Sequence, residues 1–161
     1  MSLTKKQMVN LMWSICDTYA KDETEFETMM YAHMGQYDKS GEHYFHHPLS
    51  VARNFMSDTK EYKVALLHDV LEDTEVSEED LELLMVNEEV IEAVKCITHL
   101  PHESLEEYLR RVKGNPIALK VKLADIADNM REDRLQKLPK ETQERLREKY
   151  KKSLEILEEY K

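Results

Sequence analysis

One short segment carries four ionisable side chains: His68, Asp69, Glu72 and Asp73. In a helix, residues four positions apart share a face, so the imidazole and the carboxylates would lie along one side. The apolar run at residues 64–67, directly before them, would hold that helix in the core. Burying such groups costs on the order of several kcal/mol unless they are paired or bind a metal. The segment therefore predicts a site for a divalent cation.

Two further segments supply partners for this cluster. His47 lies 21 residues upstream, and Pro48 places it at the expected start of a helix, in an extended, cap-like conformation. Asp125 follows Leu-Ala in a later helix, where it shares one face with Lys122 and Asn129. Two imidazoles and two carboxylates form a mixed nitrogen and oxygen shell, which suits Mn²⁺, Fe²⁺ or a similar ion better than a closed zinc site.

Over residues 32–131 the chain resembles the HD superfamily of metal-dependent phosphohydrolases. It is most similar to the hydrolase domain of the RelA/SpoT enzymes and their small stand-alone relatives, which remove the 3′-pyrophosphate of the alarmone (p)ppGpp. The segments that carry the resemblance are Ala32-His33-x-Gly35-Gln36, Lys39-Ser40-Gly41-Glu42, Tyr44-x-x-His47-Pro48, Ala65-Leu66-Leu67-His68-Asp69-Val70, Glu72-Asp73-Thr74, Lys122-Leu123-Ala124-Asp125 and Asn129-Met130-Arg131.

The resemblance implies a role for each matched residue. The metal ligands would be His47, His68, Asp69 and Asp125, and the ion would be a single divalent one, with Mn²⁺ as first choice. Glu72 and Asp73 would orient or deprotonate the attacking water, because a bound metal lowers the pKa of water and a nearby carboxylate takes its proton. The residues on the substrate side would be Lys39, Tyr44, Lys122 and Asn129, with the two lysines offsetting phosphate charge.

The chain departs from the family pattern at three positions. Asp38 stands where the family carries an arginine that packs on guanine, and Ile126 and Asp128 replace an arginine and a histidine. Removal of the 3′-pyrophosphate of (p)ppGpp is therefore the first hypothesis. The alternatives are hydrolysis of another nucleotide or phosphorylated cofactor at the same metal site, and a non-catalytic module that binds the alarmone.

The other histidines and Asp128 are less favoured as metal ligands. His46 could replace His47, but the position of Pro48 favours His47. Asp128 could approach the metal, although a solvated role or a contact with a ligand is expected instead. His33 is expected to pack a loop, and surface positions are expected for His43, His99 and His102.

The elements that must position these residues are helical. Only three glycines and four prolines occur, too few for the turns of an all-β fold. Apolar periodicity and capping residues predict helices near 8–19, 23–34, 48–57, 61–73, 77–84, 88–98, 104–113, 116–132 and from 139 onward. We therefore expect an all-α bundle of about seven to nine helices, and the resemblance implies that this bundle is HD-domain-like. Residues 1–161 would form one domain, with the motifs in a core at about 32–131 and flanking helices at both ends.

Composition narrows the partners and the location. The net charge is −10, and residues 72–92 hold ten acidic residues without a lysine or arginine, which disfavours nucleic-acid binding. There is no apolar run of membrane-spanning length and no signal-peptide pattern. Together with two cysteines expected to be core thiols, Cys16 and Cys96, this predicts a cytoplasmic protein. Its expected partner is a small nucleotide substrate, and assembly of copies through the flanking helices stays open.

Overall fold

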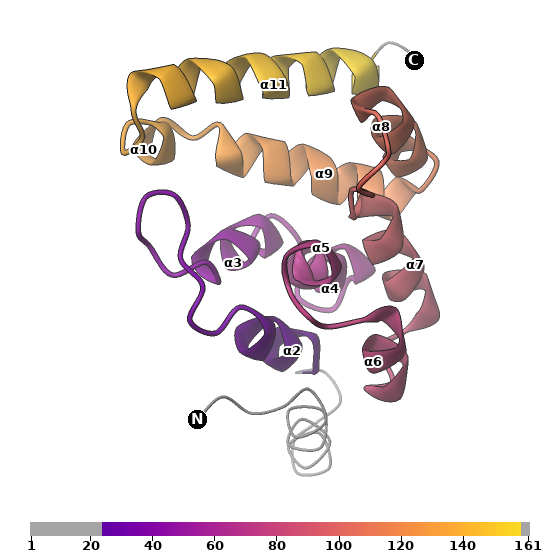
Figure 1. Ribbon diagram of the computed structural model, residues 1–161. Helices are drawn as coiled ribbons and strands as arrows, with labels where there is room; N and C mark the ends of the chain where they lie inside the picture. Colours follow the sequence, from indigo (N-terminus) through magenta and orange to yellow (C-terminus); the bar gives the residue numbers. More distant parts are fainter. Residues whose placement is uncertain (1–23, 159–161) are drawn as a thin grey trace.

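The fold of the described residues, 24–158, is all-α, as the sequence predicts (Figure 1). It is known from a computed structural model. Within this range the only β contact is an isolated bridge between Tyr37 and His43. The helices are α2 Thr24–Ala32, α3 His46–Ala52, α4 Lys60–Leu67, α5 Val70–Asp73, α6 Glu78–Leu83, α7 Glu88–Ile97, α8 Leu105–Lys113, α9 Pro116–Asn129, α10 Glu132–Leu135 and α11 Lys140–Glu158. The helix expected near 8–19, which includes Cys16, lies outside the described residues.

Capping residues start several helices where the sequence predicts them. Ser77 and Asp80 form a reciprocal capping box at the start of α6, and Ser104 and Glu107 form another at α8. The side chain of Asn115 accepts hydrogen bonds from the second and third residues of α9, which opens with a proline. These capping contacts define the residues at which the three helices begin.

The α4 helix lies at the centre of the fold. Its residues Val64–Leu67 are at most 1% exposed. Helices α2, α3, α7 and α9 pack against it, and Figure 1 shows α11 running beside α9 on the side away from α3 and α4. Burial of this apolar run fixes α4, and with it the position of the ionisable residues that follow. None of the described helices has the length and apolar content that a membrane crossing requires.

The helix predicted over residues 61–73 is interrupted after Leu67, which was not expected. His68 uses its ring Nδ1 to contact the carbonyl oxygen of Ala65 at 2.7 Å, and the φ of Asp69 is −101° with ψ near −4°, outside regular helical values. The amide of Asp73 still donates to the carbonyl of Asp69 at 2.9 Å. The His68 side chain thus competes for a backbone carbonyl of the preceding turn, and a new helical turn, α5, begins after Asp69.

Three smaller expectations were also wrong. The α3 helix begins at His46, so His47 is helical rather than extended; Pro48 fits because the first N–H groups of a helix need no intrahelical partner. The same helix ends at Ala52, five residues early, where the Asn54 amide donates to the last carbonyls. The helical spacing of Leu119, Leu123 and Ile126 predicts that Leu123 faces the core, but this residue is 39% exposed.

Candidate metal centre

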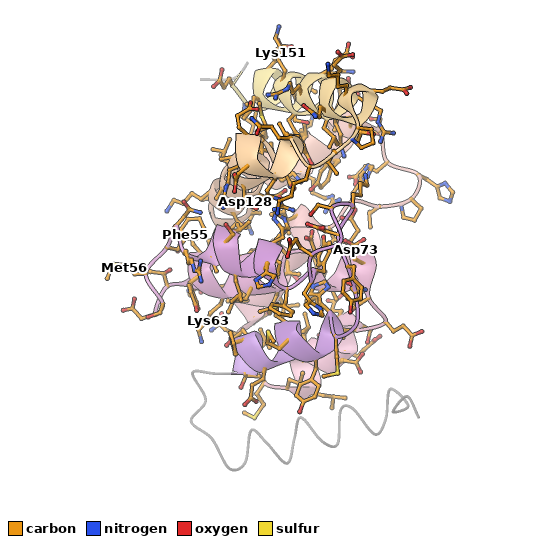
Figure 2. The ribbon with its side chains drawn as sticks, turned by 90° about the vertical axis from the view of Figure 1, so that its left-hand side faces the viewer. Phe55, Met56, Lys63, Asp73, Asp128 and Lys151 are labelled. Atoms are coloured by element: carbon orange, nitrogen blue, oxygen red, sulfur yellow. The ribbon has the colours of Figure 1, made fainter. Side chains whose placement is uncertain are left out.

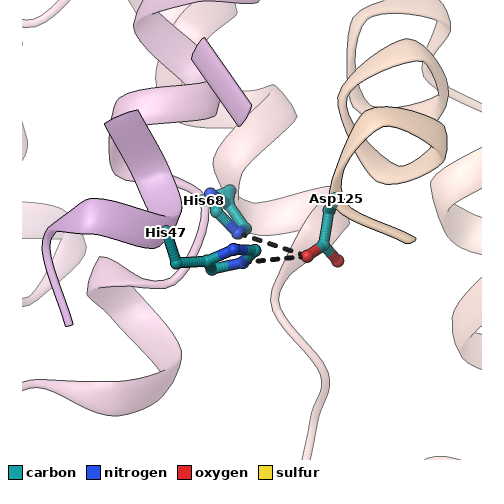
Figure 3. Close-up of side chains that lie close together, drawn as sticks. All are labelled: His47, His68 and Asp125. Atoms are coloured by element: carbon teal, nitrogen blue, oxygen red, sulfur yellow. Dashed lines mark hydrogen bonds and ion pairs between the residues drawn. The ribbon is translucent and has the colours of Figure 1, made fainter. Parts of the chain in front are cut away.

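Side chains from three helices converge on one point in the core (Figure 3). His47 of α3, His68 at the end of α4 and Asp125 of α9 each offer a ligand atom, and these atoms lie within 4.8 Å of one another. The Nε2 atoms of His47 and His68 are 3.0 and 3.8 Å from the same oxygen, Oδ1 of Asp125. All three residues are buried. Residues separated by up to 78 positions thus form a compact nitrogen and oxygen cluster.

Asp69 lies at the edge of this cluster. Its Oδ2 is 3.0 Å from Nε2 of His68 and 3.7 Å from Nε2 of His47. The side chain is 18% exposed, more than either histidine, so it lies on the open side of the cluster. The structure therefore brings together all four residues that the sequence offers as ligands.

The hydrogen bonding of His68 is compatible with a bound cation. Its Nδ1 lies 2.7 Å from a carbonyl oxygen, which can only accept, so the ring donates there and Nε2 keeps its lone pair when the imidazole is neutral. That Nε2 is buried without a hydrogen-bond partner, although carboxylate oxygens of Asp69 and Asp125 face it. A lone pair opposite carboxylate oxygens is a favourable arrangement for a positive ion, so the cluster could hold a metal.

A neighbouring group orients each of the candidate ligands. Asn129 and Lys122 donate to the two oxygens of Asp125 at 2.6 and 2.9 Å. The hydroxyl of Tyr44 donates to Asp69 at 2.7 Å. Such outer contacts fix the rotamers of ligands and raise metal affinity in known metal sites.

His47 is oriented by a buried carboxylate, Asp128. The Oδ2 of Asp128 lies 2.8 Å from Nδ1 of His47, which leaves Nε2 to face the cluster. Asp128 also accepts from Ser50, Arg131 and Arg134. It is only 5% exposed, so the expectation of a solvated side chain was wrong, whereas its contact with the candidate ligand His47 agrees with the other alternative.

Neighbouring opposite charges determine the pKa values of the ionisable groups in the cluster. Burial alone would lower the pKa of His47, but hydrogen bonds to Asp125 and Asp128 raise it to about 9. Burial opposes the charged forms of Asp69 and Asp125 as well, yet facing cations hold the pKa of both carboxyls well below the usual range: His68 for Asp69, and Lys122 for Asp125. The carboxylates therefore stay ionised, and protons on the imidazoles provide part of the positive charge that a metal would replace.

The cluster opens into a pocket of about 550 Å³. Its walls come from the 37–44 loop, α3, the α4–α5 junction, the end of α7, and helices α8 to α11. Glu72 is exposed there, and its Oε2 accepts from the backbone amide of His99 at 2.9 Å. Asp73 accepts from the hydroxyl of Tyr44 at 3.1 Å. The two carboxylates are thus accessible from the pocket that the candidate ligands share.

The four predicted substrate-side residues line the same pocket. Asn129, Lys122 and Tyr44 also donate to carboxylates of the cluster, whereas Lys39 is exposed on the loop. Outside the site, His33 is buried and packs on the ring of Tyr44 at 4.8 Å between centroids, as expected for a loop-packing group. His43, His99 and His102 lie at the surface as predicted, and His46, the less favoured alternative to His47, is exposed as well.

Among the pocket residues to which the sequence assigned no site role are Arg134, Lys149 and Tyr150. Arg134 lies on α10, a helix of four residues too short to give a periodic signal. Lys149 and Tyr150 lie on α11, and the inward apolar spacing of that helix predicts Tyr150 as a packing residue without indicating a pocket. Lys149 sits three residues after inward-facing Leu146, a helical spacing that places both on one side.

Comparison with protein-family models finds no match for this chain. A guanosine-3′,5′-bis(diphosphate) 3′-pyrophosphohydrolase of Borreliella burgdorferi is 34% identical over 153 residues, covering 81% of this chain and 22% of the relative. The bifunctional (p)ppGpp synthase/hydrolase SpoT of Escherichia coli is 33% identical over 113 residues, covering 62% of this chain and 16% of the relative. The chain thus spans about a fifth of the length of these curated relatives.

A solved structure supports the same relationship. It is described as a metazoan ortholog of SpoT that hydrolyzes ppGpp and plays a role in starvation responses. The two structures superpose with a TM-score of 0.69 at 27% sequence identity, covering 87% of this chain and 86% of the other. The chain is a distant homologue of SpoT/Rel (p)ppGpp hydrolase domains. The all-helical fold of the described residues matches that of the SpoT hydrolase domain, and in this chain the buried histidine and aspartate cluster lies in its core.

Proposed function

We propose that this protein is a metal-dependent phosphohydrolase that removes the 3′-pyrophosphate of (p)ppGpp. The observation that supports it most directly is the buried cluster at His47, His68 and Asp125, with the unpaired Nε2 of His68 facing carboxylate oxygens. The homology to (p)ppGpp hydrolase domains supports the choice of substrate. The pocket volume of about 550 Å³ is within the range usual for small-molecule sites.

In this proposal the four clustered residues, His47, His68, Asp69 and Asp125, hold one divalent cation, with Mn²⁺ as first choice. When bound, the ion would supply Lewis acidity toward a phosphoryl oxygen and toward water. Glu72 and Asp73 are placed on the pocket side of the cluster, where a carboxylate can accept the proton of the attacking water. Water attacks the phosphorus atom that is bonded to the 3′ oxygen of the ribose. The bond between this phosphorus and the 3′ oxygen breaks, pyrophosphate is released, and a proton is transferred to the 3′ oxygen.

The substrate-side residues act through position and charge. Asn129 and Lys122 hold Asp125 and border the pocket, and Tyr44 holds Asp69 in the same way. Lys39 contributes an exposed ammonium group on the 37–44 loop, where it can neutralise substrate phosphate. These side chains would orient the leaving group as well as the ligands.

The test is release of pyrophosphate from ppGpp by purified protein loaded with Mn²⁺. We expect turnover by the wild type and a loss of about 10³-fold or more in Asp69→Ala, the scale of metal-assisted catalysis. Asp133→Ala is the matched control, because Asp133 is exposed and pairs with Arg131 outside the pocket. Absence of turnover in the wild type, or undiminished turnover in Asp69→Ala, would refute the proposal; binding of ppGpp without turnover would indicate a non-catalytic module.

A second candidate is hydrolysis of another nucleotide or phosphorylated cofactor at the same centre. Asp38 favours it, because a carboxylate lines the pocket on the 37–44 loop and lies 3.6 Å from the guanidinium of Arg134. A carboxylate at that point of the pocket wall accepts hydrogen bonds, so it selects a base or sugar that can donate them. A panel of nucleotides ranked by kcat/KM separates the two candidates: the first requires ppGpp to rank highest.

A further inference from the structure

A buried histidine and a glutamine connect the end of α2 to the end of α5. His33 is 0% exposed, and its Nδ1 lies 2.7 Å from Oε1 of Gln36. The other polar atom of this amide, Nε2 of Gln36, donates to the backbone carbonyl of Asp73 at 2.8 Å. The described residues that line the pocket include Asp73 but neither His33 nor Gln36. The pair therefore supports a pocket residue from outside the pocket.

The carbonyl of Asp73 determines how the atoms of this pair are arranged. A carbonyl oxygen only accepts hydrogen bonds, so the NH₂ group of Gln36 faces it and the amide oxygen faces His33. Nδ1 of His33 then donates, and its Nε2, which is buried without a hydrogen-bond partner, keeps a lone pair. Burial lowers the pKa of His33, which favours this neutral form. A flipped amide would lose both hydrogen bonds, so the pair has one satisfied arrangement.

The same pair positions Tyr44, which contacts the carboxylates of the site. The rings of His33 and Tyr44 are 4.8 Å apart between centroids, and the amide of Tyr44 donates to the carbonyl of Gln36 at 3.0 Å. The Tyr44 hydroxyl lies 2.7 Å from Oδ2 of Asp69 and 3.1 Å from Oδ2 of Asp73. Asp73 is thus held at two points, its backbone by Gln36 and its carboxylate by Tyr44.

The α5 helix needs support from outside because it is a single turn. It has four residues, Val70–Asp73, and the chain is extended at Thr74, which follows it. The last carbonyls of a helix have no partner within the helix, and the Gln36 amide satisfies that of Asp73. Without this bond the end of the turn is free to open, and its carboxylate moves with it. A misplacement of about 1 Å can cost about 100-fold in rate.

We propose that Gln36, oriented by His33, is a positioning residue that fixes the carboxylate of Asp73 beside the attacking water. The inference rests on the proposed function, in which Glu72 and Asp73 orient or deprotonate that water. Gln36 acts through Asp73 and not through the substrate. Its loss should therefore slow the chemical step, while metal and substrate keep the side chains that bind them.

Gln36→Met tests the role, because it removes the amide and keeps the length of the side chain. In ppGpp hydrolysis by the Mn²⁺-loaded protein, we expect kcat to fall by about 10- to 100-fold. KM and the affinity for Mn²⁺ should change by less than about threefold, the pattern of an interaction that matters only in the transition state. Gln36→Glu keeps the shape and the acceptor for His33 but lacks the donor to Asp73, so it should be as slow as Gln36→Met.

Asn54→Leu is the matched control. The Asn54 amide donates to a backbone carbonyl at the end of α3 at 2.9 Å, as Gln36 does at the end of α5. Figure 2 shows Phe55 and Met56, the next two residues, at the outer edge of the fold and on the opposite side of the view from Asp73. The thermal midpoint of this variant should fall about as much as that of Gln36→Met, with kcat kept within about threefold.

Hydrogen exchange gives a measurement that does not depend on turnover. The amide of Asp73 donates to the carbonyl of Asp69 at 2.9 Å, so its exchange rate reports opening of the α5 turn. In the metal-free protein, we expect this amide to exchange about 10-fold faster in Gln36→Met, the effect of one lost hydrogen bond. Its exchange in Asn54→Leu should equal that of the wild type.

The outcomes separate this inference from the proposed function. Faster exchange at Asp73 in Gln36→Met together with an inactive wild type would keep the support of α5 by Gln36 and reject the hydrolase. Unchanged exchange, unchanged kcat, or a rise in KM as large as the fall in kcat would each overturn the positioning role. An equal fall of kcat in Asn54→Leu would also overturn it, because the effect would then follow from lost stability alone.

Discussion

Two lysines of one pocket illustrate how its two ends differ. Lys122, at the metal end, donates to Asp125, and the facing carboxylate raises its pKa despite burial. Lys149, on the α11 wall, has no carboxylate partner among the described residues, and burial lowers its pKa. The same residue type thus compensates protein charge at one end and leaves its own charge available at the other.

The difference extends to the residues around each lysine. At the metal end the polar groups hold one another: Asn129 and Lys122 hold Asp125, and Asp128 holds His47. The fold itself therefore sets that geometry before a ligand arrives. The α11 wall presents a cation and an aromatic ring whose full role depends on what binds there. Substitutions at the metal end should accordingly affect metal binding and stability, and those at the wall should affect nucleotide affinity.

The largest effect is expected from Asp125→Asn. The change removes a negative charge that faces His47, His68 and Lys122, and it leaves the buried ammonium group of Lys122 without its counter-ion. We expect metal binding to be lost at micromolar concentrations and the free energy of unfolding to fall by about 3–5 kcal/mol. Metal titration calorimetry and urea unfolding measure the two effects. Asp133→Asn, at an exposed position, is the control. Unaltered metal affinity would show that the cluster is not the metal site.

The pH dependence of the metal-free protein should show the next largest effect. The pKa of His47 is about 9 in the folded protein, against 6.5 for an ordinary histidine, so the folded state binds the proton more tightly. Its stabilising contribution is fully present below pH 6.5 and is lost as the pH rises to about 9. The loss should be on the order of 3 kcal/mol. Burial acts against protonation of His68, but the neighbouring carboxylate of Asp69 raises its pKa as well, in the same direction.

Urea unfolding between pH 6 and 9.5, in chelator and in excess Mn²⁺, measures this dependence. With metal bound the imidazoles are neutral ligands, so metal affinity should rise over the same pH range while the metal-free protein loses stability. His46→Gln is the matched control, since His46 is exposed beside His47. Equal pH profiles with and without metal would contradict the prediction.

A smaller effect is expected from Asp128→Asn. The amide keeps the size of the carboxylate but removes the charge that Nδ1 of His47, Arg131 and Arg134 share. We expect metal affinity to fall by about 10- to 100-fold, the range known for groups that orient metal ligands. Ser50→Ala removes one neutral donor to the same carboxylate and should cost less. If Asp128→Asn binds metal as tightly as the wild type, the orientation of His47 does not depend on this contact.

Much of the metal end could be predicted from the sequence, and little of the α11 wall could. The four candidate ligands lie next to strong local signals: an apolar run before His68, a proline after His47 and a capped helix that carries Asp125. Those signals indicate which segments are helical, although α3 begins at His46 rather than after His47. The same periodicity did not predict the break at His68, because it arises from a side-chain contact to the preceding turn.

The roles of Arg134 and Lys149 depend on long-range packing. Arg134 reaches Asp128 and Asp38 from a single-turn helix, and Lys149 reaches the pocket because α11 lies beside α9. Neither residue has a neighbouring pattern that distinguishes it from other charged residues of a solvated helix. Asp128 could be predicted as a candidate contact by its spacing from Asp125, but its burial could not. Local sequence therefore specifies the ligands better than it specifies the wall.

The smallest effect is expected from Asp38→Asn, at the wall formed by the 37–44 loop. Oδ1 of Asp38 accepts from the amide and hydroxyl of Ser40 and the amide of Glu42, and an asparagine oxygen can accept the same bonds. Only the ion pair with Arg134, 3.6 Å away, is lost. We expect the free energy of unfolding to fall by less than about 1 kcal/mol and metal affinity to stay unchanged.

Asp38→Ala serves as the contrasting variant, because it removes the loop hydrogen bonds as well as the charge. It should destabilise the protein by about 1–2 kcal/mol and raise KM for the preferred nucleotide more than Asp38→Asn does. Urea unfolding and steady-state kinetics on both variants give the comparison. A loss of metal binding in Asp38→Asn would mean that Arg134 transmits the state of the loop to Asp128 and His47. The two ends of the pocket would then be one coupled unit, because a change at the wall would alter the geometry of a metal ligand.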